Sequence, residues 1–309
     1  MSDDRPLVSI LMNCRNGARY LRAAIESVLA QTYQNWELVF WDNQSTDCSA
    51  AICKSYPDSR IKYFRSNQDT NLGCARALAM ERARGDFIAI LDVDDLWVPR
   101  KLERQMPLFD DDGVGIVISD TLFFTDDGKE RQLYKRGLPP QGWVFHELVS
   151  NYFVSLETVV LRRTAIESVG QGFDATFSHI CDLDLIIRIS QRWKLACVGE
   201  VLGKWRVHPY SASWVEPDRF YQEKLEFLKK MDSLEWLQSD WLKSREIFVR
   251  NVNISEAVSS LARGDRKRCR SMLQPYIPFC AKADLIYGLS WVPLGIRSLR
   301  FYRRTKGMC

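Results

Sequence analysis

The sequence predicts an α/β fold in which a mostly parallel sheet is flanked by helices. Apolar, strand-like runs alternate with stretches of helical periodicity through the first 120 residues, and strands separated by helices of roughly 10–15 residues are typical of βαβ units. The run 87–91 is continuously apolar, as expected for a strand covered on both faces. Beyond residue 216 the pattern is helical throughout. We therefore predict an α/β domain over 1–215 and a helical C-terminal region over 216–309.

Hydrophobic periodicity places the elements of the first domain in chain order. An apolar strand at 7–12 is followed by a helix at 18–30 and by a second strand at 37–41. The polar turn after that strand places Ser45 or Thr46 to cap a helix that runs to about residue 55. The pattern continues with strands at 60–64, 87–91 and 114–119 and with helices at 72–84 and 99–109, the last with a proline in its first turn.

Regularity decreases between residue 120 and the predicted domain boundary near residue 215. Asp126-Asp-Gly-Lys is typical of a hairpin turn. The remaining predictions are a loop at 138–142, a strand at 153–161, a helix at 182–192 and, in the C-terminal region, helices at 220–231, 244–263 and 267–273. We find no internal repeat or low-complexity segment along the chain.

The composition is ordinary for a globular protein, with 309 residues that are 46% hydrophobic and 27% charged. The N-terminal residues lack the order of a secretory signal, and no run reaches the roughly 20 apolar residues of a membrane-spanning helix. The nine cysteines include no CxxC pair, which argues against a metal or disulfide framework. We expect a cytoplasmic protein with reduced thiols.

The net charge of +4 is unevenly distributed. Residues 216–309 carry 18 Lys and Arg against 11 Asp and Glu, and no acidic residue follows Asp284. The segment 283–309 mixes Leu, Ile, Trp and Tyr with clustered arginines, which fits a helix at an anionic membrane surface on the inner face of the cell membrane. The alternative is a terminal helix that caps a core and keeps its arginines in solvent. The basic region contains no recognised nucleic-acid-binding module, so we do not expect nucleic acid as a partner.

Polar clusters follow the ends of the predicted strands. They lie at 13–17, 42–47, 71–76 and 92–95, and in a parallel sheet the carboxyl ends of the strands meet at one edge, where such sheets bind ligands. Asp92, Asp94 and Asp95 together carry more negative charge than a simple loop requires. Carboxylate oxygens suit Mg²⁺ or Mn²⁺, which also accept oxygens from a substrate phosphate. The alternative is a polar turn in which Asp95 caps a helix.

The order and spacing of these motifs resemble the family-two glycosyltransferases of the GT-A fold. The resemblance covers about residues 6–214. It rests on Val8-Ser-Ile-Leu-Met-Asn-Cys-Arg-Asn-Gly, on Ile25-Glu-Ser-Val-Leu-Ala-Gln-Thr-Tyr-Gln-Asn-Trp-Glu, on Asp42-Asn-Gln-Ser-Thr-Asp, on Asn71-Leu-Gly-Cys-Ala-Arg, on Gly85-Asp-Phe-Ile-Ala-Ile-Leu-Asp-Val-Asp-Asp and on Trp97-Val-Pro-Arg-Lys-Leu-Glu. It implies a GT-A domain that binds a nucleoside-diphosphate sugar.

The resemblance also implies roles for the residues that match the family's motifs. Asp42 would hold the base or ribose, Arg76 would lie near the diphosphate or the sugar, and Asp94 of the DXD motif would coordinate the metal. Asp92 would contact the ribose, the sugar or the metal. The nucleotide-sugar site would comprise Asn13, Arg15, Asp42, Asn71, Arg76, Asp92 and Asp94. The alternatives are that Asp42 starts a turn, that Asn71 caps a helix and that Arg76 is a solvated helix charge.

On the acceptor side, Asp182 matches the family's catalytic base within His179-Ile-Cys-Asp-Leu-Asp. A carboxylate placed there can accept the proton of an acceptor hydroxyl as it attacks. Cys181 stands where the family usually has Glu, which puts acceptor placement and activity in question. Asp184 points elsewhere on a helix and is positioned to hold Arg188 at i+4. His208 would approach the diphosphate or the metal, with capping or packing as the alternative.

The function implied is inverting transfer of a sugar, with Mn²⁺ or Mg²⁺, from a nucleoside-diphosphate sugar, with UDP favoured, to a glycan or lipid-linked glycan in cell-surface polysaccharide biosynthesis. The alternative is a catalytically silent module that binds nucleotide sugar or glycan, which Cys181 favours and the retained Asp182 opposes. A dinucleotide oxidoreductase is disfavoured, because no GxGxxG follows the first strand.

Overall fold

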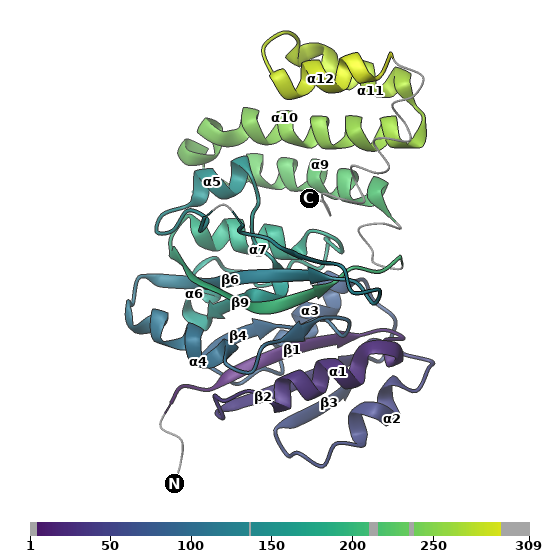
Figure 1. Cartoon of the computed structure of the whole chain (residues 1–309). Helices are drawn as coiled ribbons and strands as arrows, with labels where there is room; N and C mark the ends of the chain where they lie inside the picture. The colour runs from purple at the N-terminus through teal and green to yellow at the C-terminus, as the bar shows by residue number, and fades with distance from the viewer. Residues whose placement is uncertain (1–4, 136, 210–215, 235–237, 292–309) are drawn as a thin grey trace. The chain divides into compact units, whose positions relative to one another are not determined.

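The computed structural model describes residues 5–135, 137–209, 216–234 and 238–291 (Figure 1). The chain divides into two compact units, which are described separately. The first comprises residues 1–145 and 152–208, and the second comprises residues 146–151 and 209–309.

The first unit is built on one mixed sheet, to which the described residues contribute nine strands. From β3 through β2 and β1 to β4 all neighbours are parallel, whereas β8 runs antiparallel to both β4 and β6. β6 and β9 are parallel, and β5 and β7 pair antiparallel with β9 and β6. In spatial order the strands are β3 (Ile61–Arg65), β2 (Trp36–Asp42), β1 (Val8–Cys14), β4 (Phe87–Ile90), β8 (Val160–Arg162), β6 (Val114–Phe124), β9 (Lys194–Arg206) and β5 (Leu96–Trp97), with β7 (Glu130–Gln132) beside β6.

Helices cover both faces of the parallel half of this sheet. Helix α1 (Ala18–Leu29) buries Leu21, Ile25 and Val28 in the core that also contains alternate residues of β1. Helix α3 (Leu72–Met80) contacts β1 and β2, and its buried residues lie outside that core, which places it on the other face. The remaining helices of this unit are α2 (Ser49–Lys54), α4 (Lys101–Gln105), α6 (Arg163–Ser168) and α7 (Cys181–Ser190). The predicted α/β class is confirmed.

Three local predictions are wrong. The helix expected at 99–109 is α4 followed by the 3₁₀ helix η1 (Met106–Asp110), because Pro107 has no N–H for an α-helical bond. Helix α2 begins after Cys48, and the side chain that accepts its first amide N–H, from Ser49, is that of Asp47 at 3.0 Å rather than that of Ser45 or Thr46. The segment 153–161 is irregular around the 3₁₀ helix η2 (Leu156–Thr158), and the short β8 begins only at its end.

The second unit is helical. Helices α9 (Pro217–Ser233) and α10 (Gln238–Arg263) share an aromatic core in which the rings of Phe227, Trp241 and Phe248 lie 5.3–6.1 Å apart. A second core joins α10 to α11 (Arg266–Leu273) and α12 (Ala281–Leu289). The unit also includes α5 (Phe145–Ser150) and the 3₁₀ helix η4 (Gln274–Tyr276). Among the described helices, none is long and apolar enough to cross a membrane.

Candidate active site

The loops after β1, β2 and β4 converge at the carboxyl edge of the parallel strands. Cys14 and Asp42 are register partners at the ends of β1 and β2. Beyond them, the Asn16 amide N–H donates to Ser45 Oγ at 3.0 Å, and the Ala18 amide N–H donates to Asp47 Oδ2 at 3.0 Å. The two polar loops are therefore joined to each other, as the parallel arrangement predicts.

Asp42 organises the turn that follows β2. Its carboxylate is fully buried. Oδ1 accepts the Ser45 amide N–H at 2.8 Å, and Oδ2 accepts the Tyr63 hydroxyl at 2.6 Å. Burial, together with this hydrogen bond, raises the pKa of Tyr63 to about 12. Asp42 thus starts a turn, as the alternative interpretation held, and its contact with a nucleotide stays a prediction.

Asn13 at the end of β1 carries a buried amide without a hydrogen-bond partner. Its side chain is only 8% exposed, yet neither Oδ1 nor Nδ2 is bonded. The indole N–H of Trp41, its register partner in β2, is also buried and unpaired. Buried polar groups are nearly always hydrogen-bonded, so an amide in this state marks a place where a ligand or an ordered water supplies the missing bonds.

Arg15 and Asn71 already have protein partners. Arg15 forms an exposed ion pair of 2.5 Å with Asp69. Asn71 caps helix α3, since its Oδ1 accepts the Cys74 amide N–H at 2.8 Å while its Nδ2 donates to the Ala175 carbonyl at 2.6 Å. The capping alternative for Asn71 therefore describes its geometry.

Arg76 connects the loop after β4 to the first turn of α7. Its buried guanidinium donates from Nη2 to both oxygens of Asp92, at 2.8 and 3.0 Å, and from Nη1 to Cys181 Sγ at 3.2 Å. Burial opposes the charge, but Asp92, Cys181 and Asp182 together raise the pKa of Arg76 above its ordinary range. Arg76 is therefore a buried cation that holds two loops together, and the solvated-helix alternative is wrong.

Gly73 explains how α3 comes close enough to α7 for that contact. A Cβ atom at this position would lie 2.5 Å from the Asp174 carbonyl oxygen and closer still to that of Phe177. The Leu72 amide N–H also donates to Ser178 Oγ at 3.4 Å. The start of α3 therefore lies directly against the loop that precedes α7, and only glycine permits this approach.

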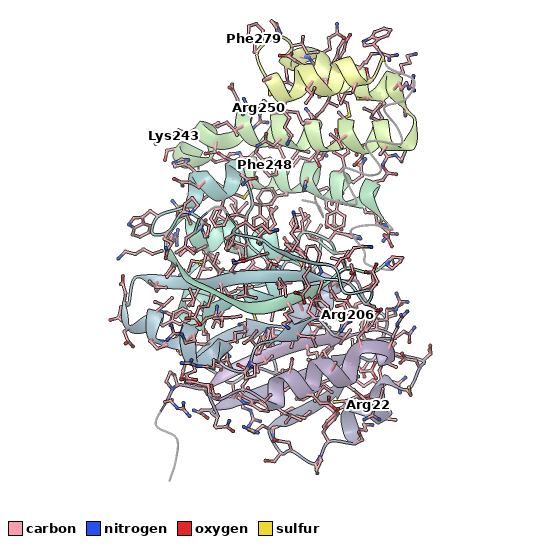
Figure 2. The ribbon with its side chains drawn as sticks, viewed as in Figure 1. Arg22, Arg206, Lys243, Phe248, Arg250 and Phe279 are labelled. Atoms are coloured by element: carbon pink, nitrogen blue, oxygen red, sulfur yellow. The ribbon has the colours of Figure 1, made fainter. Side chains whose placement is uncertain are left out.

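The Asp92–Asp95 turn is fixed by Arg206 at the end of β9 (Figure 2). The Arg206 amide N–H donates to Asp95 Oδ1 at 2.9 Å, and its Nε donates to the Asp94 carbonyl at 3.0 Å. Burial, reinforced by the neighbouring Asp94, raises the pKa of Asp95 well above its ordinary value. Strand β5 follows Asp95 directly, so the prediction that Asp95 caps a helix is wrong.

His208 and Asp94 lie together, with Nε2 2.9 Å from Oδ2. They offer one imidazole nitrogen and one carboxylate oxygen, a pair suited to Mn²⁺, while Mg²⁺ is usually held by one or two carboxylates plus substrate phosphates. No group of three or more His, Cys, Asp or Glu side chains within the described residues could hold a metal ion, and Asp92 is engaged by Arg76. The residues therefore fit a cation that takes its remaining ligands from substrate and water.

Asp182 occupies the first turn of α7. Its Oδ2 accepts the Tyr152 hydroxyl at 3.0 Å. Burial raises the pKa of Asp182, although Arg76 and the hydrogen bond from Tyr152 oppose the shift. A carboxylate with a raised pKa is suited to accept a proton near neutral pH. No pattern in the sequence points to Tyr152, because it lies in an irregular segment.

Asp184, two residues further along α7, has a different environment. It is fully buried, and its Oδ2 lies 2.6 Å from Nη2 of Arg188, one turn along the helix. Arg188 also donates to the carbonyl oxygens of Gln171 and Gly172 at 2.6 and 2.7 Å. The predicted pairing of Asp184 with Arg188 is present, and it anchors α7.

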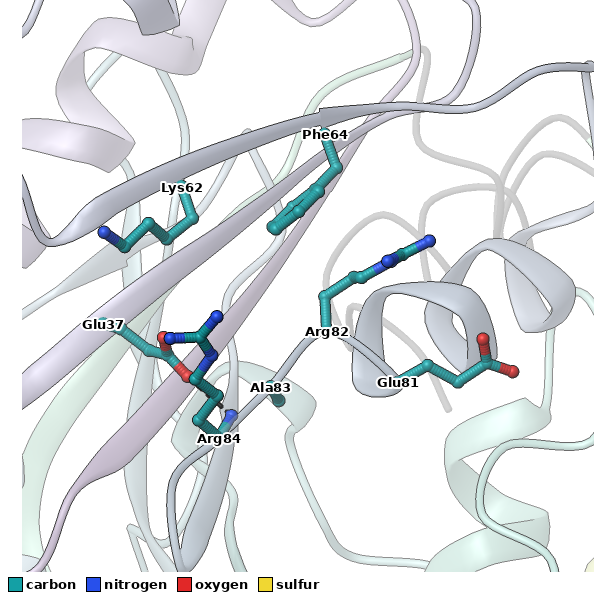
Figure 3. A pocket seen from close by; sticks show the side chains of 7 residues that line it. All are labelled: Glu37, Lys62, Phe64, Glu81, Arg82, Ala83 and Arg84. Carbon is teal, nitrogen blue, oxygen red and sulfur yellow. Dashed lines mark hydrogen bonds between the residues drawn. The ribbon is translucent and has the colours of Figure 1, made fainter.

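A separate cavity lies away from these residues. It has a volume of about 310 Å³ and is bordered near the starts of β2 and β3 and beyond the end of α3 (Figure 3). Within it the Arg84 amide N–H donates to Glu37 Oε1 at 2.6 Å. It is lined by Glu37, Lys62, Phe64, Glu81, Arg82, Ala83 and Arg84. None of the predicted site residues is among these, so the cavity is no part of the candidate active site.

The chain matches known proteins in sequence. The profile of Glycosyl transferase family 2 matches residues 9–168. The chain is 31% identical over 212 residues to UDP-Glc:alpha-D-GlcNAc-diphosphoundecaprenol beta-1,3-glucosyltransferase WfgD of Escherichia coli, covering 68% of this chain and 81% of that protein. It is 28% identical over 173 residues to TuaG of Bacillus subtilis, a glycosyltransferase provisionally assigned by name to teichuronic acid biosynthesis, covering 55% of this chain and 67% of that protein.

Solved structures match the fold. The structure of S. aureus TarS 1-349 in complex with UDP aligns with a TM-score of 0.61 at 14% identity, covering 97% of this chain and 92% of that one. The mannosyltransferase PcManGT of Pyrobaculum calidifontis, in complex with GDP-Man and Mn²⁺, aligns with a TM-score of 0.61 at 16% identity, covering 98% and 87%. At these identities the likeness establishes the fold alone, and the expected GT-A fold is confirmed.

Proposed function

The chain belongs to glycosyl transferase family 2, and from that premise we propose that it transfers a sugar from a nucleoside-diphosphate sugar to a hydroxyl of a glycan or lipid-linked glycan. The observation that carries the proposal is the Arg76 guanidinium, which bridges Asp92 in the donor-side loop and Cys181 beside the acceptor-side Asp182. Relatives named for polysaccharide synthesis and for a diphosphoundecaprenol-linked acceptor support the same class of product.

On the donor side, we assign the nucleotide to the joined loops after β1 and β2. The unpaired amide of Asn13 supplies one donor and one acceptor there, and the turn built on Asp42 shapes the pocket wall. Arg15 adds an exposed positive charge near the same loops. A UDP-sugar is the favoured donor, because the Escherichia coli relative is named for UDP-Glc and a TarS structure contains UDP-GlcNAc.

Asp94 and His208 are the proposed ligands of Mn²⁺ or Mg²⁺. A divalent cation bound there would stabilise negative charge on the diphosphate leaving group, and the Mn²⁺ named in the Pyrobaculum structure supports this use. Arg76 lies behind Asp92 in the protein interior. We therefore assign Arg76 to positioning Asp92, whose carboxylate then faces the ribose or the sugar.

Asp182 is the proposed general base of an inverting displacement. The acceptor oxygen bonds to the anomeric carbon as the bond from that carbon to the phosphate oxygen breaks. The hydroxyl proton passes to the Asp182 carboxylate, and the nucleoside diphosphate leaves with the electron pair. The Tyr152 hydroxyl bonded to Oδ2 fixes the orientation of this carboxylate, which helps to place its basic oxygen toward an acceptor.

Cys181 is compatible with this assignment. Burial raises the pKa of its thiol to about 11, so the thiol is neutral and leaves the carboxylate of Asp182 as the basic group that faces Tyr152 and Arg76. A catalytically silent module would bind the donor but would not require a carboxylate at position 182.

A donor screen tests the proposal. Nucleotide sugars are added to the protein with and without Mn²⁺, and the melting temperature is followed, because a ligand that binds the native state raises it by mass action. We expect a UDP-sugar to give the largest shift, Mn²⁺ to enlarge it, and Asp94→Asn to abolish the Mn²⁺ effect.

Hydrolysis of the best donor, measured as release of the nucleoside diphosphate, then separates an enzyme from a silent module. Binding without hydrolysis or transfer to any glycan acceptor would favour the silent module. An absence of any shift with all donors would contradict both.

The predicted cytoplasmic location stays a prediction. The predicted membrane contact was placed on residues 283–309, of which 292–309 lie outside the described residues.

A further inference from the structure

Helix α12 presents apolar residues to solvent as well as to its core. Ala283 and Ile286 are buried against α10 and α11, while Leu285 on the other side is 65% exposed. Phe279 in the loop just before the helix is 86% exposed (Figure 2), and Trp291 just after it is 62% exposed. An exposed apolar patch on a folded protein usually marks an interaction site. We call Phe279, Leu285 and Trp291 the α12 surface.

Positive charge borders the α12 surface. Helix α11, which packs against α12, has four basic residues and no acidic one. The Arg270 guanidinium lies 4.1 Å above the ring of Trp291, and Lys267 is one turn away on the same side of α11. Lys282 is exposed and lies one turn before Leu285 in α12. At Trp291 a cation therefore lies directly over a large apolar ring, and Leu285 has a lysine one turn away.

We propose that the α12 surface docks the helical unit onto a bilayer that contains anionic lipids. Phe, Leu and Trp side chains partition into the boundary between headgroups and acyl chains, and neighbouring Lys and Arg are attracted to anionic headgroups. Trp and the long stems of Lys and Arg suit this boundary, because each has an apolar body and a polar end. Nucleic acid would use the cations but leave Phe279 and Leu285 without a partner.

This proposal goes beyond the proposed function and does not depend on it, because it rests on the helical unit alone. It overlaps the contact predicted for residues 283–309 at Leu285 and Trp291, but it includes Phe279 and rests only on residues that precede position 292.

Vesicle co-sedimentation of the full-length chain tests the proposal. Vesicles of phosphatidylcholine are compared with vesicles that also contain phosphatidylglycerol, at low and high salt. We expect binding to the anionic vesicles that weakens as salt rises. The triple variant Phe279→Ser, Leu285→Ser, Trp291→Ser should lose about tenfold or more of that binding, since it removes three apolar side chains from the boundary.

Two matched substitutions serve as controls. Leu242→Ser and Trp143→Ser remove side chains that are 59% and 63% exposed, close to the values for Leu285 and Trp291, and should leave vesicle binding unchanged. Circular dichroism confirms that each variant is folded. Lys267→Glu with Lys282→Glu should weaken binding to anionic vesicles without affecting the weak binding to neutral ones.

Three results would overturn the proposal. The first is equal binding by the triple variant and the wild type. The second is equal binding to neutral and anionic vesicles. The third is a wild-type dimer that becomes a monomer in the triple variant while vesicle binding is unchanged, which would identify a second copy of the chain as the occupant of the surface.

Discussion

The two units show different exceptions to the usual distribution of polar and apolar groups, the sheet unit in its interior and the helical unit on the α12 surface. The sheet unit buries charged side chains, among them Arg76, Asp95, Lys101 and Glu157. The helical unit exposes large apolar side chains on the α12 surface. Buried charges and exposed apolar patches are the informative exceptions in a folded protein. Buried charges therefore direct attention to a candidate active site, and exposed apolar side chains direct attention to a candidate docking surface.

The buried charges are tolerated because each has specific partners. Lys101 Nζ bonds Gln105 Oε1 at 2.7 Å and lies 4.1 Å above the ring of Trp97. Glu157 accepts hydrogen bonds from the hydroxyls of Ser155 and Thr121. Burying a charge in this way costs free energy of desolvation, but its hydrogen bonds then hold the side chain in one position. In the Asp92–Asp95 turn, hydrogen bonds from Arg76 and Arg206 hold the carboxylates of Asp92 and Asp95 in the same way.

The largest expected effect separates two acids on one helix. Asp182→Asn should reduce kcat by about 10²–10⁴-fold, since it removes the proposed base, while donor affinity stays nearly unchanged. Asp184→Asn should lower stability and leave kcat per folded molecule close to wild type, because Asp184 is paired with Arg188. Steady-state kinetics and denaturant unfolding distinguish the two. Equal losses of kcat in both variants would remove Asp182 from its role.

The pH dependence of the same reaction has a defined sign. Burial raises the pKa of Asp182 above its ordinary value of 3.8, and only the ionised carboxylate accepts a proton. Activity should therefore fall as the pH drops through that raised pKa, at a higher pH than for a solvated Asp. A profile of kcat against pH at saturating donor measures the midpoint, and a midpoint at or below 3.8 would contradict the assignment.

Two buried arginines should differ in what their loss affects. Removing Arg76 should lower both stability and activity, whereas removing Arg188 should lower stability alone. Arg76→Met leaves Asp92 and Asp182 without their shared counter-charge and should cost about 3 kcal/mol, with a large loss of kcat. Arg188→Met should cost a similar amount, because its ion pair is fully buried, but should spare kcat per folded molecule. Unfolding curves paired with single-turnover rates test this. If Arg76→Met retains full turnover, Arg76 has only a structural role.

Lys101 should make stability depend on pH in the alkaline range. Burial lowers its pKa to about 7 from an ordinary value of 10.5. Between these values the unfolded chain binds one more proton than the folded protein, so the free energy of unfolding rises with pH by at most about 1.4 kcal/mol per unit. Urea unfolding from pH 7 to 10 should show a shallower slope for Lys101→Met. The exposed Lys62→Met should keep the wild-type slope.

The smallest expected effect is that of the exposed Leu285 in α12, which is compared with its buried neighbour. Ile286 is buried and Leu285 is exposed. Ile286→Ala should cost about 2–5 kcal/mol, whereas Leu285→Ser should change stability by less than about 0.5 kcal/mol. Thermal unfolding of both variants measures the contrast. A large loss from Leu285→Ser would show that this side chain contributes to folding, and would remove the reason to seek an external partner.

The parts of the fold that could be predicted have local signals. Strands β1, β2 and β4 are apolar runs that end in polar clusters. The sequence therefore predicts both the strands and the edge of the sheet where their carboxyl ends meet. Strand β9 was missed, because Gly199 and Gly203 with the charges around them interrupt the alternation that identifies a strand. The antiparallel β8 has only three residues, which is too short for any periodicity to be detected.

The candidate site also has a part that local motifs predict and a part that depends on contacts between distant residues. Asp92, Asp94 and Asp182 lie in contiguous motifs, so the sequence places them directly. Arg76 was found as a residue, but its bond to Cys181 spans 105 positions and the bond between Tyr152 and Asp182 spans 30. Contacts over such separations depend on how α3 and α7 pack, and spacing along the chain does not encode that packing.

That packing has a consequence for engineering. Even a methyl group at position 73 would collide with two backbone oxygens and push α3 away from the loop that precedes α7. A library that seeks a new sugar specificity has freedom to vary the polar loops. If it also randomises position 73, every active clone should carry glycine there.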